Sequence, residues 1–164
     1  MKKLAAALAC ASMFACGDSP LPGAMLGTYQ VVGQSKTNSC GLGAPNPWNF
    51  DAELSEQRTT VYWSWMDGSP LLSGALGGQG TVTLGRSGTV NADSTDAGLG
   101  PCNLQRTDEL DLTLATGNKS FTGTISYSYV VASGATCTDQ LVSSGGQFNA
   151  LPCTVSYTVT GTRQ

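Results

Sequence analysis

The sequence predicts an all-β domain in which an antiparallel meander closes into a barrel; a β-sandwich is the second choice. Residues 121–131 and 154–161 alternate between two sets of side chains without a break. A period of two is typical of a strand with one buried and one solvated face. No stretch of ten residues has helical periodicity, and eight or nine short strands at regular spacing favour a barrel or a sandwich. Short sequential connections favour the meander.

The first half of the domain holds five predicted strands. They are expected at residues 27–32, 50–54, 59–66, 72–76 and 81–85. In the third of these, Val61, Trp63 and Trp65 share one face. The segments 67–70 and 77–78 contain the glycine, proline and aspartate residues that are typical of turns, and they separate the later strands.

The second half begins with the acidic, glycine-rich segment 91–100, which is predicted to be a loop. A further strand or strand edge is expected to start at residues 102–104. Residues 109–114 continue as a strand with leucines inward and acidic residues outward. A Gly-Asn turn then leads into the strand at 121–131.

Residues 132–151 form a connection of twenty residues between the last two long strands, with a short strand expected near 147–149. Connections of this length are uncommon in compact domains and are usually functional or internally structured. Two alternatives follow: a flap that recognises a partner, or a disulfide-bonded excursion with a structural role only.

The N-terminus has the organisation of an export signal. Lys2 and Lys3 precede an apolar segment at 4–14, which is too short to span a bilayer because a spanning helix needs about 20 residues. The next residues, Ala15-Cys16-Gly17, resemble the lipobox of bacterial lipoproteins. The resemblance implies that Cys16 becomes the first residue of the mature chain and carries the lipid, palmitate chains included.

Two alternatives to lipidation at Cys16 remain open: lipidation at Cys10, or ordinary cleavage after a nearby alanine, which would give a secreted protein without a lipid. In the lipoprotein family, an aspartate after the lipidated cysteine retains the protein in the inner membrane. Gly17 stands at that position, so the resemblance implies the outer membrane.

The predicted organisation is a lipoprotein signal peptide at 1–15, a lipidated cysteine with a flexible tether at 16–26, and one disulfide-bonded all-β domain at 27–164. The expected location is the cell envelope. The expected partners are the membrane, through the lipid on Cys16, and either an envelope protein or a small apolar ligand.

Four cysteines lie within the domain, and an even number in an exported chain predicts two disulfides. We favour Cys137–Cys153 with Cys40–Cys102, because the first pair brackets a single connection between strands; the other two pairings remain open. The spacings do not suit a four-cysteine metal site, which needs closely spaced pairs.

The composition excludes several classes of function. The chain contains no histidine, which removes Ser-His-Asp and Cys-His catalysis and histidine-ligated metals. Loss of Lys2 and Lys3 with the signal peptide leaves 6 basic against 11 acidic residues. Nucleic acid is not an expected partner, because binding it needs clustered Lys and Arg. We expect no cofactor, no metal and no enzymatic activity.

The first strand of the domain opens with Gly27-Thr28-Tyr29. This opening resembles the Gly-x-Trp motif that begins the first strand of lipocalins, and the resemblance implies a barrel that carries a small apolar molecule. Five aromatic residues fall on predicted inward faces and are the candidates for such a pocket: Trp63, Trp65, Tyr127, Tyr129 and Tyr157. The alternative is that these rings only fill the core.

Two acidic groups are candidate sites. The segment 91–98 offers oxygen ligands for calcium but fails the EF-hand spacing, so a solvated loop is favoured. Asp108, Glu109 and Asp111 form a second acidic group, in which Glu109 and Asp111 share the outer face of a strand. Nothing in the spacing identifies a pair of carboxylates that face each other across a cleft, as a glycosidase requires.

The function expected from the sequence is therefore a non-enzymatic, envelope-tethered interaction or structural module. The first alternative is a lipocalin-like barrel that binds a small apolar ligand. The second alternative is a carboxylate-dependent hydrolase, for which the sequence offers acidic residues and no further signal.

Overall fold

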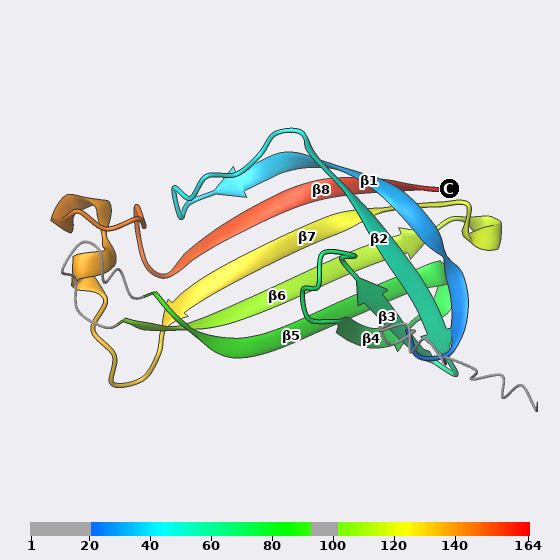
Figure 1. The fold of residues 1–164 in the computed structure, drawn as a ribbon, viewed down its shortest axis with the longest axis horizontal. Coiled ribbons are helices and arrows are strands. Elements are labelled where there is room, and N and C mark those ends of the chain that lie inside the picture. Colours follow the sequence, from blue (N-terminus) through cyan, green and yellow to red (C-terminus); the bar gives the residue numbers. More distant parts are fainter. Residues whose placement is uncertain (1–20, 93–101) are drawn as a thin grey trace, which may run out of the picture.

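The computed structural model of the chain describes residues 21–92 and 102–164 and confirms the predicted fold class. Eight antiparallel strands form a closed barrel in which each strand pairs with the next and the last pairs with the first (Figure 1). The strands are β1 (Ala24–Asn38), β2 (Trp48–Gln57), β3 (Thr60–Ser64), β4 (Leu72–Leu76), β5 (Thr81–Asn91), β6 (Asn103–Leu114), β7 (Ser120–Val131) and β8 (Cys153–Arg163).

Four short 3-10 helices complete the secondary structure of the described residues. They are η1 (Gly78–Gly80), η3 (Thr116–Asn118), η4 (Thr138–Gln140) and η5 (Val142–Ser144). Within the ranges that the structure describes, no helix is both long and apolar enough to cross a lipid bilayer.

The strands differ greatly in length, and this difference leaves part of the inner face uncovered. β3 and β4 have five residues each, whereas β5 to β8 have 11 or 12. β4 pairs with β5 only as far as Gly85, and β5 continues from there paired with β6. β5 to β8 therefore extend well beyond β3 and β4, toward the left in Figure 1. We call this extension the open half.

The other half of the barrel is filled by apolar side chains. The predicted inward residues of β5 and β6 are buried, and so are those at the start of β7: Val82, Leu84, Leu110, Leu112, Leu114, Phe121 and Ile125. Trp63 lies among them with no exposed surface. The period-two pattern thus predicted the core correctly, because alternate residues of a strand point to the same face.

Gly161 on β8 is part of this core and has no room for a side chain. It is buried opposite Phe121 of β7 in the strand register. A Cβ atom built on Gly161 would run into the ring of Phe121. The absence of a side chain at Gly161 therefore makes room for the ring of Phe121 on the neighbouring strand.

All four domain cysteines form disulfides, but not in the favoured pairing. Cys40 is bonded to Cys153, and Cys102 is bonded to Cys137. The favoured pairs Cys137–Cys153 and Cys40–Cys102 are wrong. In a closed meander the last strand pairs with the first, so the residues just after β1 lie beside the start of β8. In the same way, the residue before β6 lies near the segment that follows β7.

Several predicted boundaries also change. The third predicted strand ends at Ser64 rather than at residue 66, and the fifth continues to Asn91. The short strand expected near 147–149 is only an isolated bridge between Leu141 and Phe148, and the connection instead contains η4 and η5. Asn91 and Ala92 are described, but the rest of the candidate calcium segment 91–98 lies outside the described residues, as do the predicted signal peptide and Cys16.

Candidate functional site

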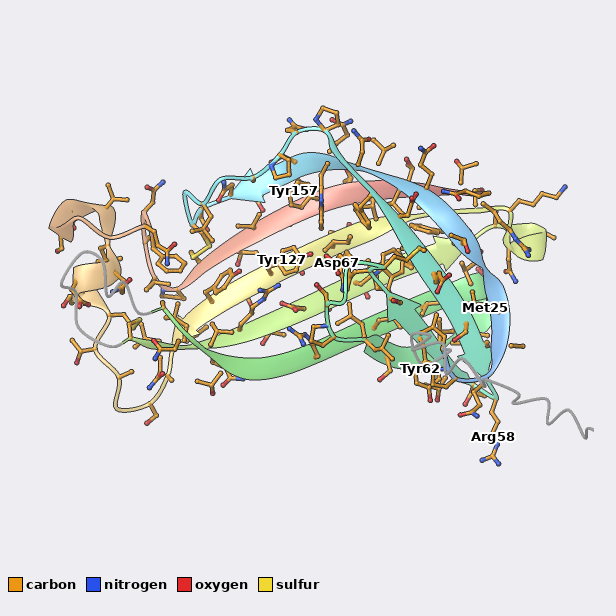
Figure 2. All side chains as sticks on the ribbon, viewed as in Figure 1. Met25, Arg58, Tyr62, Asp67, Tyr127 and Tyr157 are labelled. Carbon is orange, nitrogen blue, oxygen red and sulfur yellow. A yellow bond between two sulfur atoms is a disulfide. The ribbon has the colours of Figure 1, made fainter. Side chains whose placement is uncertain are left out.

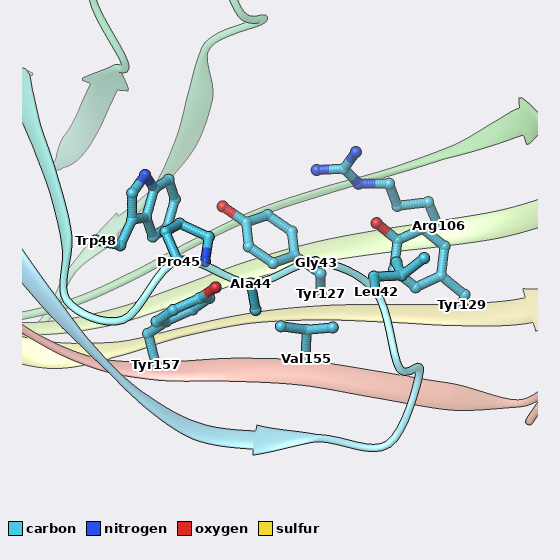
Figure 3. Close-up of a pocket in the computed structure, with 10 residues that line it drawn as sticks. All are labelled: Leu42, Gly43, Ala44, Pro45, Trp48, Arg106, Tyr127, Tyr129, Val155 and Tyr157. Atoms are coloured by element: carbon cyan, nitrogen blue, oxygen red, sulfur yellow. The ribbon is translucent and has the colours of Figure 1, made fainter. Parts of the chain in front are cut away.

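A cavity of about 280 Å³ lies in the open half of the barrel. β6, β7 and β8 supply one side of it, and the connection between β1 and β2 supplies the other (Figure 3). The lining is mostly apolar or aromatic: Leu42, Gly43, Ala44, Pro45, Trp48, Arg106, Tyr127, Tyr129, Val155 and Tyr157. We call it the aromatic cavity.

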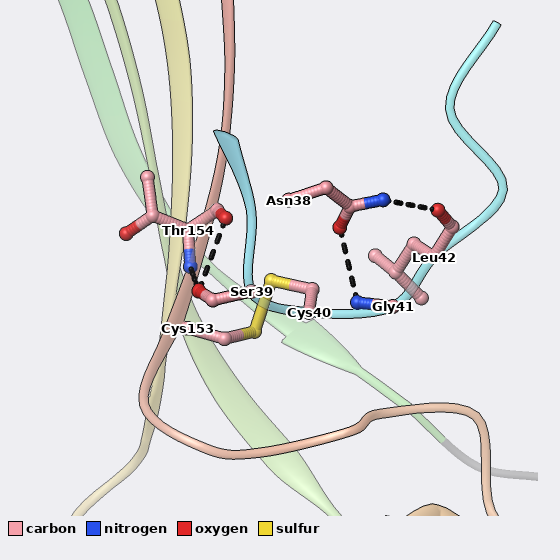
Figure 4. The surroundings of a disulfide bond; sticks show 7 residues. All are labelled: Asn38, Ser39, Cys40, Gly41, Leu42, Cys153 and Thr154. Atoms are coloured by element: carbon pink, nitrogen blue, oxygen red, sulfur yellow. Dashed lines mark hydrogen bonds between the residues drawn. A yellow bond between two sulfur atoms is a disulfide. The ribbon is translucent and has the colours of Figure 1, made fainter. Parts of the chain in front are cut away.

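The wall formed by residues 42–45 is fixed to the sheet by a covalent bond. Cys40, two residues before this wall, is bonded to Cys153 at the start of β8 (Figure 4). The backbone N–H of Asn149 also donates to the carbonyl oxygen of Cys40 at 2.7 Å. The β1–β2 connection is therefore held from β8 and from the 132–151 connection together.

Asn38, the last residue of β1, folds the same connection locally. Its Nδ2 donates to the carbonyl oxygen of Leu42 at 2.7 Å, and its Oδ1 accepts from the backbone N–H of Gly41 at 3.0 Å (Figure 4). Gly41 has a φ of +74°, and a Cβ atom there would also run into the side chain of Asn149. Glycine suits both requirements, since it has no Cβ and adopts positive φ readily.

Trp48, the first residue of β2, is the centre of an aromatic cluster at the cavity. Its ring centroid lies 4.3 Å from that of Phe50, 5.1 Å from Tyr157, 5.8 Å from Trp65 and 6.4 Å from Tyr127. Tilted and stacked arrangements at about 4.5–7 Å are the favourable geometries of aromatic pairs, and the Trp48–Phe50 pair is slightly closer than this range. The cluster thus presents rigid ring faces to the cavity.

Three charged side chains from the inner face of the sheet form a cluster beside these rings. Asp108 of β6 accepts from Nε of Arg86 on β5 at 3.0 Å through Oδ2, and from Nε of Arg106 through Oδ1. The Asp108 side chain is only 7% exposed, whereas the arginine side chains are about one third exposed. The carboxylate is therefore enclosed, and the two guanidinium groups reach the surface of the open half.

The sequence contained a signal for this cluster that our prediction did not use. Arg106 and Asp108 are in phase with the inward residues Leu110 and Leu112 of β6, and Arg86 is in phase with the inward Leu84 of β5. We grouped Asp108 with Glu109 and Asp111 as an acidic group, although its phase places it on the opposite face from them. Two or three inward charges in a predicted β-barrel indicate a polar interior site.

Arg106 is held over two of the tyrosine rings. Its Cζ lies 4.9 Å from the ring centroid of Tyr127 and 5.8 Å from that of Tyr129, within the range of cation–π attraction. Burial alone lowers the pKa of Arg106, but the hydrogen bond to Asp108 and the nearby tyrosines outweigh it, so the pKa is raised overall. The group is a permanent cation in a fixed orientation.

The three tyrosines of the cavity keep their hydroxyl groups available. We find no hydrogen bond from the hydroxyls of Tyr127, Tyr129 or Tyr157 to any residue in 21–92 or 102–164. In contrast, the hydroxyl of Tyr29 in the core donates to the carbonyl oxygen of Asn118 at 2.9 Å. Buried tyrosines usually find a partner, so these three are free to bond to water or to a ligand.

A second cavity of about 320 Å³ adjoins the first and shares Trp48, Arg106 and Tyr127 with it. The β3–β4 connection closes it with Trp65 and Asp67. The backbone N–H of Ser69, which donates to Asp67 at 2.8 Å, holds the pKa of that exposed carboxyl below its usual value. Asp67 is therefore charged, and it makes no ion pair with a described residue.

The structure distributes the five predicted pocket residues over three places. Tyr127, Tyr129 and Tyr157 line the aromatic cavity, and Trp65 lines the adjoining one. Trp63 lies in the filled core and lines neither cavity. Trp48, the 42–45 wall and both arginines are further lining residues that the sequence did not predict. Figure 3 shows Tyr127 and Tyr157 among the residues that line the aromatic cavity.

The predicted flap, residues 132–151, lies beyond the cavity at the end of the open half. Phe148 is buried there and packs on Tyr129 with ring centroids 5.8 Å apart. The Cys102–Cys137 disulfide ties the segment to the start of β6. The connection is therefore internally structured, as its length predicted, and it supports the cavity from one end.

We expect the pH dependence of stability to report the burial of Tyr127. Burial is the largest cause that raises the pKa of this phenol above its ordinary value of 10.0; Arg106 opposes it, and Asp108 adds to it. Because the unfolded chain loses the phenolic proton first as the pH rises, the free energy of unfolding falls above a pH of about 10. Urea unfolding of Tyr127→Phe between pH 9 and 11 should give a shallower fall than the unchanged chain; parallel curves would contradict this placement of Tyr127.

The site therefore offers ring faces, three phenol hydroxyls and a pair of guanidinium groups in one concave surface. Within residues 21–92 and 102–164, no three Cys, Asp or Glu side chains are grouped as metal ligands would be. Comparisons of the chain with protein-family models, with curated proteins and with solved structures found no match.

Proposed function

We propose that this protein binds a small ligand with a flat apolar body in the aromatic cavity of its β-barrel. This corresponds to the first alternative from the sequence, a barrel that carries a small apolar molecule, with the binding place moved from the barrel centre to the open half. The observation that supports it is the cluster of rings around Trp48, which leaves an open space of about 280 Å³ in front of it.

The two halves of the barrel differ in the space that they leave for a ligand. In the filled half, large side chains such as Trp63 and Phe121 occupy the interior, so a ligand would have to displace them. In the open half, a preformed space near the lower end of the usual range for ligand pockets is lined by ring faces. A flat molecule in this space would remove apolar ring surface from water, which contributes about 25 cal/mol per Å².

The wall opposite the rings is preorganised, and this favours binding. The disulfide from Cys40 and the hydrogen bonds from Asn38 fix the 42–45 segment before any ligand arrives. Binding of a ligand therefore costs little conformational entropy of this loop. A smaller entropy cost is the main way in which rigid sites gain affinity.

A fluorescence titration with N-phenyl-1-naphthylamine, a neutral probe that carries a naphthyl and a phenyl group, tests this proposal on the full chain with both disulfides formed. We expect saturable binding, and we expect Trp48→Ala to weaken it by about tenfold or more, because an aromatic contact and its buried area are lost. Tyr62→Ala is the matched control, since Tyr62 lies on β3 away from the cavity (Figure 2) and should leave the affinity unchanged. Absence of saturable binding, or equal affinity for Trp48→Ala and the unchanged chain, would overturn the proposal.

We further propose that binding takes place in the cell envelope, with the chain held to the membrane by lipid on Cys16. The two disulfides support export, because such bonds persist in oxidising compartments. Lipidation, outer-membrane location and the absence of enzymatic activity stay predictions from the sequence. The short segment between Cys16 and β1 would keep the barrel close to the lipid surface.

A further inference from the structure

The charged cluster of Arg86, Asp108 and Arg106 is not balanced. Two guanidinium groups share one carboxylate, so one positive charge remains beside the aromatic cavity. Asp67 is the other acidic residue that lines the adjoining cavity, but it is exposed and lies outside ion-pair distance of both arginines. A cation at a partly enclosed site attracts an anion more strongly than one in bulk water, because the local dielectric is lower.

The arginines also have unused hydrogen-bond donors. Each one donates to Asp108 through Nε, and we find no partner for the Nη groups within the part of the chain that the structure describes. A guanidinium group has five N–H donors in a planar fork, and such a fork matches the two oxygens of an oxyanion. Asp108 thus orients both forks and leaves their outer edges available.

The guanidinium donors of Arg106 lie next to the aromatic rings of the cavity. Arg106 lines both cavities together with Trp48 and Tyr127. Figure 3 shows its guanidinium group on the same side of the sheet as the hydroxyls of Tyr127 and Tyr129. A ligand whose ring lies against Trp48 would therefore place a substituent on its edge close to both the phenol hydroxyls and the guanidinium fork.

We propose that the ligand of the aromatic cavity is an aromatic oxyanion, such as an aromatic carboxylate or sulfonate, whose anionic oxygens are bound by the Nη groups of Arg106 with Arg86 beside it. This inference rests on the proposed function, because it names the chemical class of the ligand that the cavity takes. Asp108 acts as a positioning residue that orients the two guanidinium groups.

Isothermal titration calorimetry with three matched compounds tests the inference on the full chain. 2-Naphthoate and 2-naphthalenesulfonate carry an oxyanion, and 2-naphthamide has the same ring without the charge. We expect the anions to bind about tenfold to a hundredfold more tightly than the amide, as charge-assisted hydrogen bonds are stronger than neutral ones. Their affinity should fall as NaCl rises, whereas that of the amide should not.

The arms of this experiment separate the two proposals. Equal affinity for amide and anions would overturn the oxyanion inference and leave the aromatic site standing. No binding of any of the three, together with no binding of the neutral fluorescent probe, would overturn the proposed function itself. Binding of only one of the two anions would decide between a carboxylate and a sulfonate as the bound group.

Arg106→Gln is the variant that tests the assigned residue. We expect it to lower the affinity for 2-naphthoate about tenfold and to change that for 2-naphthamide by less than twofold. Arg58→Gln is the matched control for net charge, because Arg58 lies in the turn after β2, away from Tyr127 (Figure 2), and lines neither cavity. If Arg58→Gln weakens naphthoate binding as much as Arg106→Gln does, the assignment is wrong. Should Arg106→Gln fail to fold, the salt dependence and the amide comparison still decide the inference.

Discussion

Replacement of Cys40 and Cys153 together by alanine is expected to lower the free energy of unfolding by about 5 kcal/mol. The two residues are 113 positions apart. In the chain-entropy model, a cross-link that closes a loop of this length lowers the conformational entropy of the unfolded chain and raises its free energy by about 5 kcal/mol. A domain of ordinary stability has only about 5–15 kcal/mol in total. We therefore expect partial unfolding of the double variant, measured by urea denaturation.

The second disulfide is the internal comparison. Cys102 and Cys137 are 35 positions apart, so the same model predicts a smaller loss of about 4 kcal/mol for their replacement. Only the first replacement also frees the 42–45 wall, so it should weaken binding of the neutral probe in the molecules that stay folded. A larger loss for the Cys102–Cys137 pair would contradict the view that the bond across β1 and β8 dominates stability.

Replacement of Trp63 by alanine is expected to cost about 3–5 kcal/mol of unfolding free energy, the usual range for a fully buried large aromatic residue. Trp63 has no exposed surface. Its ring centroid lies 5.3 Å from that of Trp65, 5.7 Å from Phe121 and 6.3 Å from Phe50. Thermal and urea unfolding measure the loss, which arises from the cavity left between these rings.

Two matched variants separate a core role from a binding role. Trp63→Phe should cost clearly less, because it keeps a ring and removes an Nε1 that is buried without a hydrogen-bond partner among the described residues. Trp48→Ala should also cost less, since Trp48 is only partly buried, although it should reduce ligand binding more. If Trp63→Ala left stability unchanged while abolishing binding, the ligand site would lie at the centre of the barrel instead.

The strands of this protein could be predicted from periodicity, while the disulfide pairing could not. The alternation in residues 121–131 depends only on local geometry, and the structure confirms the strand that it predicts. The partner of Cys40 depends on how the barrel closes, because β1 meets β8 only through a contact between the two ends of the domain. Sequence distance made Cys137 appear the natural partner of Cys153, although strand adjacency decides the pairing.

The candidate site was predictable in part for the same reason. Tyr127 and Tyr157 follow the inward phase of their strands, and both line the cavity. Whether an inward ring fills the core or lines a space depends on the lengths of β3 and β4, which turn residues fix only approximately. Trp48 was missed because it stands at the end of a loop, and Arg106 was missed because its inward phase was not applied to a charged residue.

The most direct test of a ligand site in the open half is the indole N–H region of a ¹H–¹⁵N spectrum during titration with 2-naphthoate. The chain has three tryptophans, so three indole signals are expected, and each can be assigned with a single Trp→Phe variant. We predict that the signals of Trp48 and Trp65 shift with saturation, while that of Trp63 stays in place. A shift of the Trp63 signal alone, or no shift of any of the three, would contradict the account.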